Sequence, residues 1–347
     1  MTSGRAFVVV AAAAVTLVLT ALPISARAQG GLEDHFRGKT LTVIIPTGPG
    51  GDRMANATPF MRYFGRHIPG NPNVVPSFMP GAGGAVGMNY LQSVAAQDGL
   101  TIATPLAPVV LAQVTGEKSV RYDTAKMNWI GRTADATQVL YVRGNVDVKD
   151  FNELKTKKVV IGSSGPASAS TIIPYVMNHV FGTKMHVVLG YSGSGAFNLA
   201  VQRGETDGAL TTWNNVGNNY GEQVRNGSLR ILFHVALLPN PELPTIPLAL
   251  DAAANDADRA TIELMSSSSE MGQTFVAPPG VPPHIVEALR AAFDATVKDP
   301  EYLAAMRKAG NSLNPMSGEA LTKIVAKTIN TPQSVIERYK TAITISR

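Results

Sequence analysis

Residues 41–52 read Leu-Thr-Val-Ile-Ile-Pro-Thr-Gly-Pro-Gly-Gly-Asp. This stretch indicates the fold class, because a short β-branched run ends in a glycine-rich loop, and a helix-like segment follows at 54–66. β-Branched residues favour strands, whereas glycine and proline favour tight turns. The stretch therefore predicts a strand, a loop and a helix in that order.

The same order of strand, loop and helix recurs further along the chain. A run of strand-forming residues precedes a loop rich in Gly or Ser in three more places, at residues 74–84, 159–166 and 186–195. Strands that alternate with helices predict parallel α/β sheets. Two series of such units, separated by residues 129–150, predict two lobes.

Helical segments return in the last part of the chain, at 282–297, 300–309 and 317–339, each with a Pro or Ser start signal. We expect these helices to pack on the first lobe, which makes that lobe discontinuous in sequence. Four prolines between 239 and 247 exclude a helix and predict a rigid return connection. The predicted division is lobe 1 at 29–133 and 240–347, and lobe 2 at 134–239.

The first residues predict export. Arg5 precedes an uncharged run at 6–24 that is mostly Ala, Val and Leu, and Ala26-Arg27-Ala28 has the small-x-small pattern that a signal peptidase cleaves. We therefore expect residues 1–28 to be a signal peptide, cleaved near Ala28, and the protein to be periplasmic. A retained membrane anchor is the alternative, because the apolar run is nearly long enough to span a bilayer.

The composition excludes several classes of protein. The chain has no Cys, which excludes disulfides, thiol catalysis and Cys-ligated metals. Removal of residues 1–28 leaves 28 basic against 25 acidic residues, and these charges are scattered along the chain. Nucleic-acid binding would need a clustered basic stripe, so we expect no nucleic-acid partner. The six histidines show no metal-ligand spacing, and we expect neither a metal nor an organic cofactor.

The common catalytic motifs fail on spacing. Residues 47–52 lack the Lys of a phosphate-binding P-loop, and residues 81–87 place the third glycine of a dinucleotide fingerprint one position too late. The sequences at 162–166 and 190–194 resemble a nucleophile elbow only in part. We therefore expect no enzyme. The alternative is an exported serine hydrolase that uses Ser164 or Ser192 with one of the histidines.

The small-residue loops between strands and helices remain as the candidate site. In open α/β sheets such loops lie at the carboxyl ends of the strands, where ligands usually bind. Backbone N–H groups at a helix N-terminus favour an anion. Two facing lobes would therefore surround a carboxylate with neutral donors. The alternative is that the glycines serve only to make tight turns.

The order of these motifs resembles one known family from Leu41 to about Tyr339. The chain is similar to the substrate receptors of tripartite tricarboxylate transporters, also called Bug receptors. The motifs that carry the resemblance lie at 45–52, 80–84, 162–168, 191–195, 204–207, 226–230, 243–247 and 276–282.

The resemblance implies a two-lobed type II periplasmic-binding-protein fold (a Venus flytrap), with two parallel or mixed sheets flanked by helices and a cleft between the lobes. It also implies capture of a small organic carboxylate and its delivery to membrane permease subunits. A receptor that presents its ligand to a sensor protein is the alternative. We expect a monomer that closes by rotation about its crossing segments, near 132–142 and 235–244.

The resemblance also implies which residues hold the ligand. In the first lobe they are Thr47, Gly48, Gly50 and Gly51, and opposite them lie Ser163, Ser164 and Ser168. Tyr191 and Asp207 follow by motif position.

The chain departs from the family pattern at several positions near the ligand. Asp52-Arg53 replace the usual third glycine of the first loop, and Arg53 is a candidate for a bidentate pair with a carboxylate. Arg53 paired with Asp52 or with solvent is the alternative. Thr171 and Ser192 stand where the family has His and Lys, which predicts a ligand of low charge.

Two more candidates follow the predicted strand at 208–212. Trp213 and Asn214 lie where residues lining the cleft are expected, and Trp213 either stacks on a ring or alkyl chain or belongs to the core. We therefore expect an aliphatic or aromatic mono- or dicarboxylate to bind more tightly than citrate.

Overall fold

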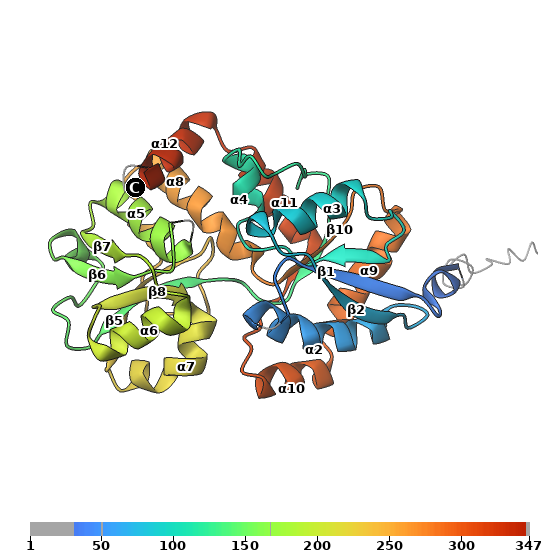
Figure 1. Cartoon of the computed structure of the whole chain (residues 1–347), viewed down its shortest axis with the longest axis horizontal. Coiled ribbons are helices and arrows are strands. Elements are labelled where there is room, and N and C mark those ends of the chain that lie inside the picture. The colour runs from blue at the N-terminus through green and yellow to red at the C-terminus, as the bar shows by residue number, and fades with distance from the viewer. Residues whose placement is uncertain (1–30, 50, 167, 345–347) are drawn as a thin grey trace, which may run out of the picture.

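The computed structural model describes residues 31–49, 51–166 and 168–344 of the 347-residue chain, so the predicted signal peptide lies outside the described residues. Figure 1 shows two lobes, each built on its own sheet. Within the described part of the chain, none of the helices is long and apolar enough to cross a membrane.

The sheet of lobe 1 has six strands in the order β11-β4-β10-β3-β1-β2. Strand β1 pairs in parallel with β2 and β3, whereas β10 is antiparallel to β3 and β4, so the sheet is mixed. The strands are β1 (Thr40–Ile45), β2 (Asn73–Phe78), β3 (Thr101–Ala103), β4 (Asn128–Arg132), β10 (Thr274–Ala277) and β11 (Met316–Ser317).

Helices cover both faces of this sheet. Alternate residues of a strand point to opposite faces, and both sets are apolar here, so each face needs a cover. Ile45 and Phe275 pack with α2, α9 and α10, whereas Ile44 and Val276 pack with α3, α4 and α11. Phe60 of α2 stacks on Phe275 with ring centroids 4.0 Å apart. The helices are α2 (Gly51–His67), α3 (Ala85–Ser93), α4 (Val109–Val114), α9 (Pro283–Thr296), α10 (Pro300–Lys308) and α11 (Gly318–Ile329).

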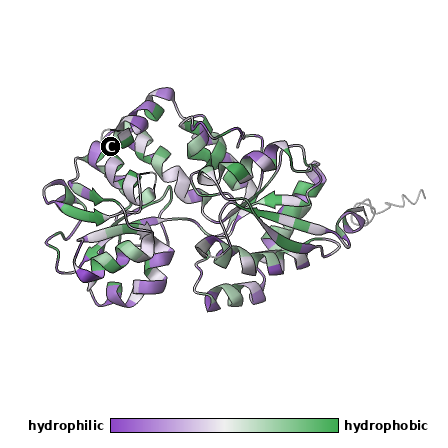
Figure 2. Cartoon of the chain, in the orientation of Figure 1, coloured by the Kyte–Doolittle hydropathy of each residue, from purple (hydrophilic) through white to green (hydrophobic). Residues whose placement is uncertain are grey.

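The sheet of lobe 2 has five strands in the order β7-β6-β8-β5-β9, with β6, β7 and β8 parallel and β5 antiparallel to its neighbours. Its two faces bury separate apolar cores, one under α5 and the other under α6 and α7. Figure 2 shows apolar strands and polar outer helix surfaces. The elements are β5 (Gln138–Arg143), β6 (Val159–Gly162), β7 (Met185–Val188), β8 (Gly208–Thr212), β9 (Leu229–Val235), α5 (Ala169–Phe181), α6 (Ser194–Arg203) and α7 (Trp213–Arg225).

The predicted fold class is confirmed, but the second boundary between the lobes lies later than residue 240. The segment 239–247 runs beside β9, where His234 N donates to the Pro247 carbonyl at 2.9 Å. The 3₁₀ helix η3 (Ala249–Ala252) and helix α8 (Asp256–Ser266) then bury Leu250 and Ile262 in the core of lobe 2. The prolines exclude a helix at 239–247, but they do not determine which lobe the segment covers.

The helix predicted at 317–339 is in fact two helices. Pro332 separates α11 from α12 (Gln333–Thr344), because proline lacks an N–H group and clashes with the preceding turn. Helix α12 lies beside α5 and α8 (Figure 1) and buries Ile336 and Tyr339 in the core of lobe 2. The assignment of all of 240–347 to lobe 1 is therefore wrong. Within the described residues the chain crosses between the lobes at 133–137, 267–273 and 330–332, so the crossing predicted near 235–244 is wrong.

Candidate functional site

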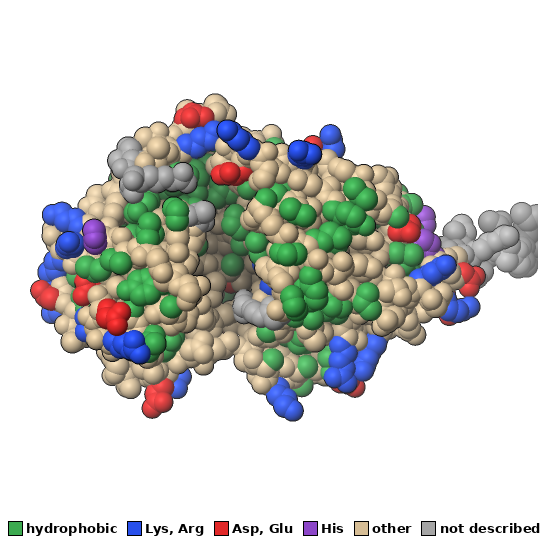
Figure 3. All heavy atoms as spheres, in the orientation of Figure 1, with side chains coloured by type: hydrophobic (Ala, Val, Ile, Leu, Met, Phe, Trp, Pro, Cys, Tyr) green, Lys and Arg blue, Asp and Glu red, His purple; other side chains and the backbone are tan. Residues whose placement is uncertain are grey.

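The carboxyl ends of the parallel strands form one edge of each sheet, and both edges lie against the crossing segments. In lobe 1, Arg53 at the start of α2 donates to the Gly272 carbonyl at 3.1 Å. In lobe 2, Trp213 N after β8 donates to the Thr137 carbonyl at 2.8 Å. Figure 3 shows the surface hollowed between the lobes. This hollow, called the cleft below, is the usual ligand position in open α/β sheets.

The first predicted loop follows β1 in lobe 1. Thr47 is half-buried and Gly48 is exposed, and the Thr47 hydroxyl donates to the Gly48 carbonyl at 3.3 Å. Gly50 lies outside the described residues. Gly51 and Asp52 form the first turn of α2. The N–H groups of a first helical turn have no partner within the helix, so this end of α2 favours an anion.

Arg53 is anchored to lobe 1 and to a crossing segment. Its guanidinium donates to the Thr104 hydroxyl at 2.9 Å and to the Gly272 carbonyl at 3.1 Å. Thr104 is fully buried and directly follows β3. The guanidinium therefore joins the loop after β3 to the second crossing segment.

Four hydroxyl groups form a cluster at the end of β6 in lobe 2. The Ser163 hydroxyl is fully buried and lies 3.0 Å from that of Ser168, 2.7 Å from that of Ser170 and 2.6 Å from that of Thr171. We call these four residues the hydroxyl cluster. Ser163 and Ser168 were predicted and Ser170 was missed, although the run Ser-Ala-Ser-Thr at 168–171 is a signal for such a cluster.

The hydroxyl cluster lies at the N-terminus of α5. Ser168 is the N-cap residue, but its hydroxyl donates to the Gly165 carbonyl at 2.7 Å and does not cap the helix. Thr171 donates to the same carbonyl at 2.7 Å, and Ser164 is exposed on the intervening loop. Ser168 is the half-buried member of the cluster, whereas Ser163, Ser170 and Thr171 are buried. The turn therefore offers the Ser168 side chain and uncapped helical N–H groups together, which suits a carboxylate.

Tyr191 lies beside the hydroxyl cluster. Its backbone N–H donates to the Ser163 carbonyl at 3.3 Å, and its half-buried ring packs over Gly162. A Cβ atom at position 162 would lie 3.2 Å from the ring and 2.9 Å from Phe197 Cβ. The absence of a side chain at Gly162 therefore allows Tyr191 to approach the strand end.

The structure does not bring Asp207 to the cleft. Asp207 precedes β8, and its carboxylate accepts from Val160 N near the start of β6 at 2.9 Å. It also lies 3.6 Å from the Arg143 guanidinium. The amino ends of these parallel strands form the edge opposite to Ser163, so Asp207 joins β6, β8 and the end of β5.

Trp213 and Asn214 line a cavity of about 110 Å³ between the lobes. We call this cavity the hinge recess. It is bounded by the first crossing segment, the start of α7, the segment 240–242 and lobe 1 residues 312–314. The Trp213 indole N–H donates to the Glu242 carboxylate. Trp213 is half-buried and is one of the residues that line the recess.

A buried ion pair connects the end of β4 to the second crossing segment. Arg132, at the end of β4, pairs with the Glu270 carboxylate in the 3₁₀ helix η4 (Ser267–Met271), and these side chains are only 2% and 3% exposed. The second Glu270 carboxylate oxygen accepts from Leu237 N of lobe 2 at 3.3 Å. This pair was not predicted, although two charges next to apolar strands are a signal for it.

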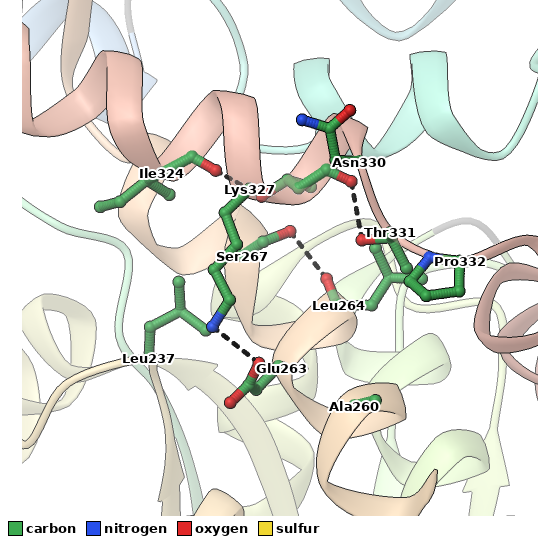
Figure 4. A pocket seen from close by; sticks show the side chains of 11 residues that line it. Leu237, Ala260, Glu263, Leu264, Ser267, Ile324, Lys327, Asn330, Thr331 and Pro332 are labelled. Carbon is green, nitrogen blue, oxygen red and sulfur yellow. Dashed lines mark hydrogen bonds and ion pairs between the residues drawn. The ribbon is translucent and has the colours of Figure 1, made fainter. Parts of the chain in front are cut away.

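A second hollow, of about 210 Å³, lies between α8 and α11 (Figure 4). Apolar side chains, including Leu237, Leu264 and Ile324, form most of its wall. Lys327 of α11 is paired with Glu263 of α8 at 2.9 Å across the lobes. Helix faces rather than strand ends build this hollow, and Lys327, the cation among its lining residues, is already paired with Glu263.

The described hydrogen bonds of the hydroxyl cluster include no histidine. Ser163 and Ser168 bond to other hydroxyl groups and to a carbonyl, not to a histidine base. Burial lowers the pKa of His234, which lies on β9 in lobe 2. Across the described residues, no group of three or more His, Asp or Glu side chains could hold a metal ion.

The comparisons with known proteins agree with this architecture. The UPF0065 protein in the gbd 5′ region of Cupriavidus necator is 25% identical over 341 residues, which cover 95% of this chain and 94% of that protein. A TctC solute binding protein from Polaromonas has a TM-score of 0.68 at 17% identity, covering 89% of this chain and 99% of its own. An R. palustris protein with adipate has a TM-score of 0.61 at 16% identity, with 87% and 98% covered.

The family match covers most of the chain. The family described as tripartite tricarboxylate transporter family receptor matches residues 66–340. This range includes the hydroxyl cluster, the hinge recess and all three crossing segments. The resemblance found in the sequence is therefore confirmed, and the chain belongs to the tripartite tricarboxylate transporter receptor family.

Proposed function

We propose that this protein is a periplasmic receptor that captures a small organic carboxylate in the cleft and delivers it to a membrane permease. The observation that carries the proposal is the hydroxyl cluster at the uncapped N-terminus of α5. Hydroxyl and N–H groups aimed at a carboxylate form charge-assisted hydrogen bonds, which are stronger than neutral ones. The ligand is bound and released without a chemical change.

Capture requires the carboxylate to leave water. In an open cleft the anion would meet one lobe and remain partly hydrated. Rotation about the crossing segments would bring the first turn of α2 against the opposite side of the ligand, with little change inside either lobe. The ligand then stabilises the closed form, because it contacts more donors there than in the open form.

The side chains near the cluster favour a ligand of low charge. A carboxylate that leaves water needs a compensating partner, and Thr171 and Ser192 carry hydroxyl groups, not cations, at the two positions where the family pattern has His and Lys. The R. palustris relative holds adipate, a six-carbon dicarboxylate. We therefore expect an aliphatic or aromatic mono- or dicarboxylate to bind more tightly than citrate.

Isothermal titration calorimetry on the chelator-treated mature protein tests the proposal with adipate, benzoate and citrate. At least one of the first two acids should bind more tightly than citrate. The matched control is Thr341→Ala on α12, which removes a hydroxyl group that bonds only within its own helix. Lack of binding by every acid would contradict carboxylate capture. Binding restored only by a divalent ion would contradict a site without a metal.

The proposed location has its own test. The mature protein should appear in the periplasmic fraction as a monomer that begins at Gln29, as measured by mass spectrometry and size-exclusion chromatography. A membrane-bound form that retains residues 1–28 would contradict the predicted cleavage.

A further inference from the structure

Carboxylate and amide side chains line most of the hinge recess, whereas the hydroxyl cluster consists of Ser and Thr side chains. Two carboxylates line it, Asp135 from the first crossing segment and Glu242 from the segment beside β9. Three amides and one hydroxyl group complete its polar wall, from Asn214, Asn240, Asn314 and Ser312. The described residues that line the recess include no Lys, Arg or His.

Both carboxylates bond to neutral donors. Asp135 accepts from Asn314 Nδ2 at 2.6 Å and from Thr137 N at 3.2 Å, and Glu242 accepts from the Trp213 indole N–H. A carboxylate oxygen has about two acceptor positions, so acceptor capacity remains on both groups. The recess is therefore negative, and a group that enters it is favoured if it donates hydrogen bonds.

The recess and the hydroxyl cluster lie on adjoining strand ends of lobe 2. Ser163 follows β6 and Trp213 follows the neighbouring strand β8, with Gly162 beside Ala209 in the register. Strand geometry then separates Ser163 and Trp213 by about 11 Å between Cα atoms. Side chains from both ends shorten this span, so a chain of about four to six carbons fits between them.

Both lobes enclose the recess. Leu313 and Asn314 come from lobe 1, and Asn314 N donates to the Thr133 carbonyl at 2.9 Å. A Cβ atom at Gly310 would lie 3.4 Å from the Asn218 side chain of α7, so the lobes approach closely there. A ligand group in the recess would contact both lobes and the first crossing segment at once.

We propose that the hinge recess holds the end of the ligand opposite to its carboxylate, and that this end carries a hydroxyl or ammonium donor. This inference rests on the proposed capture of a carboxylate at the hydroxyl cluster. The bound molecule is then a hydroxy or amino monocarboxylate, with its methylene chain against the Trp213 ring. A second carboxylate in the recess would be repelled by Asp135 and Glu242.

Calorimetry with matched probes tests this inference. The probes are adipate, 6-hydroxyhexanoate and 6-aminohexanoate, together with succinate, 4-hydroxybutyrate and 4-aminobutyrate. In at least one of the two series, the hydroxy or amino acid should bind at least about tenfold more tightly than the dicarboxylate of the same chain length. The hydroxy and amino probes distinguish a neutral donor from a charged one.

Two variants remove the charges of the recess and keep its shape. Asp135→Asn and Glu242→Gln should each reduce the preference for the donor probe over the dicarboxylate by about threefold or more. Glu242 is exposed, so its variant should fold even if Asp135→Asn is unstable. Glu205→Gln is the control, because this exposed carboxylate of lobe 2 lies outside the recess.

The outcomes separate the two proposals. Tighter binding of the dicarboxylate in both series would overturn the inference about the recess and leave carboxylate capture intact. An unchanged preference in Glu242→Gln and in a folded Asp135→Asn would also overturn it. Lack of binding by all six acids would overturn carboxylate capture, and the inference with it.

Discussion

Glu270→Ala should destabilise the protein more than any single change to an exposed ion pair. The substitution removes the carboxylate that pairs with the Arg132 guanidinium, and both side chains are almost fully buried. It also removes the acceptor of Leu237 N, through which Glu270 bonds to lobe 2. Arg132 would remain as a buried cation between the lobes.

The structure gives the expected magnitude. Removal of one partner from a buried ion pair lowers the free energy of unfolding by about 3–5 kcal/mol. Arg132 would keep two neutral acceptors, since it donates to the Asn314 carbonyl at 3.2 Å and to the backbone carbonyl of residue 270 at 3.3 Å. We therefore expect a loss near the lower limit, about 3 kcal/mol.

Urea unfolding followed by circular dichroism measures this loss. The matched control is Glu263→Ala, because the Glu263 pair with Lys327 also joins the lobes but is partly exposed. Such a pair contributes at most about 1 kcal/mol. The double variant Arg132→Met/Glu270→Leu should recover most of the loss, because it leaves no buried charge. A loss for Glu270→Ala no larger than for Glu263→Ala would contradict the large cost of leaving Arg132 buried without its partner.

Three further predictions concern binding, pH and closure. Ser168→Ala should weaken carboxylate binding, measured by calorimetry, about ten- to a hundred-fold, because a hydrogen bond to a charged group contributes about 1.5–3 kcal/mol. Unchanged affinity would mean that this hydroxyl does not contact the ligand. Burial lowers the pKa of His234 in the folded protein, so the unfolded chain binds more protons near its ordinary pKa of about 6.5. The contribution of His234 to the free energy of unfolding should therefore be fully present above that pH and be lost as pH falls. Between about pH 5 and pH 8, the urea midpoint of His234→Phe should change less with pH than that of the parent protein. Small-angle scattering should show a smaller radius of gyration at saturating ligand, and an unchanged radius would argue against closure by rotation.

The local units were predictable because their signals are local. A β-branched run followed by a glycine-rich loop places β1 and β6 within one residue of their predicted ranges. The same pattern placed Ser163 at a strand end, and the family resemblance added Ser168, whose hydroxyl the structure brings within 3.0 Å of that of Ser163. Strand order was not predictable, because β10 inserts between β3 and β4 through contacts distant in sequence.

Two errors had signals in the sequence. Pro332 interrupts the last predicted helix, and its effect on the preceding turn indicates a helix end there. Asp207 precedes its strand, so the rule that ligand loops follow strands would have excluded it from the cleft. The carboxylates of the hinge recess had no such signal, because Asp135 and Glu242 meet only through the tertiary fold.

The third crossing has a practical consequence for measuring closure. Helix α12 belongs to lobe 2, whereas Phe36, near the start of the described chain, is buried in lobe 1. Fluorophores attached near Asp34 and Thr344 would therefore lie on different lobes. Their energy-transfer efficiency would follow the opening and closing of a single molecule in real time. The same pair of positions would convert the protein into a fluorescent sensor for its own ligand.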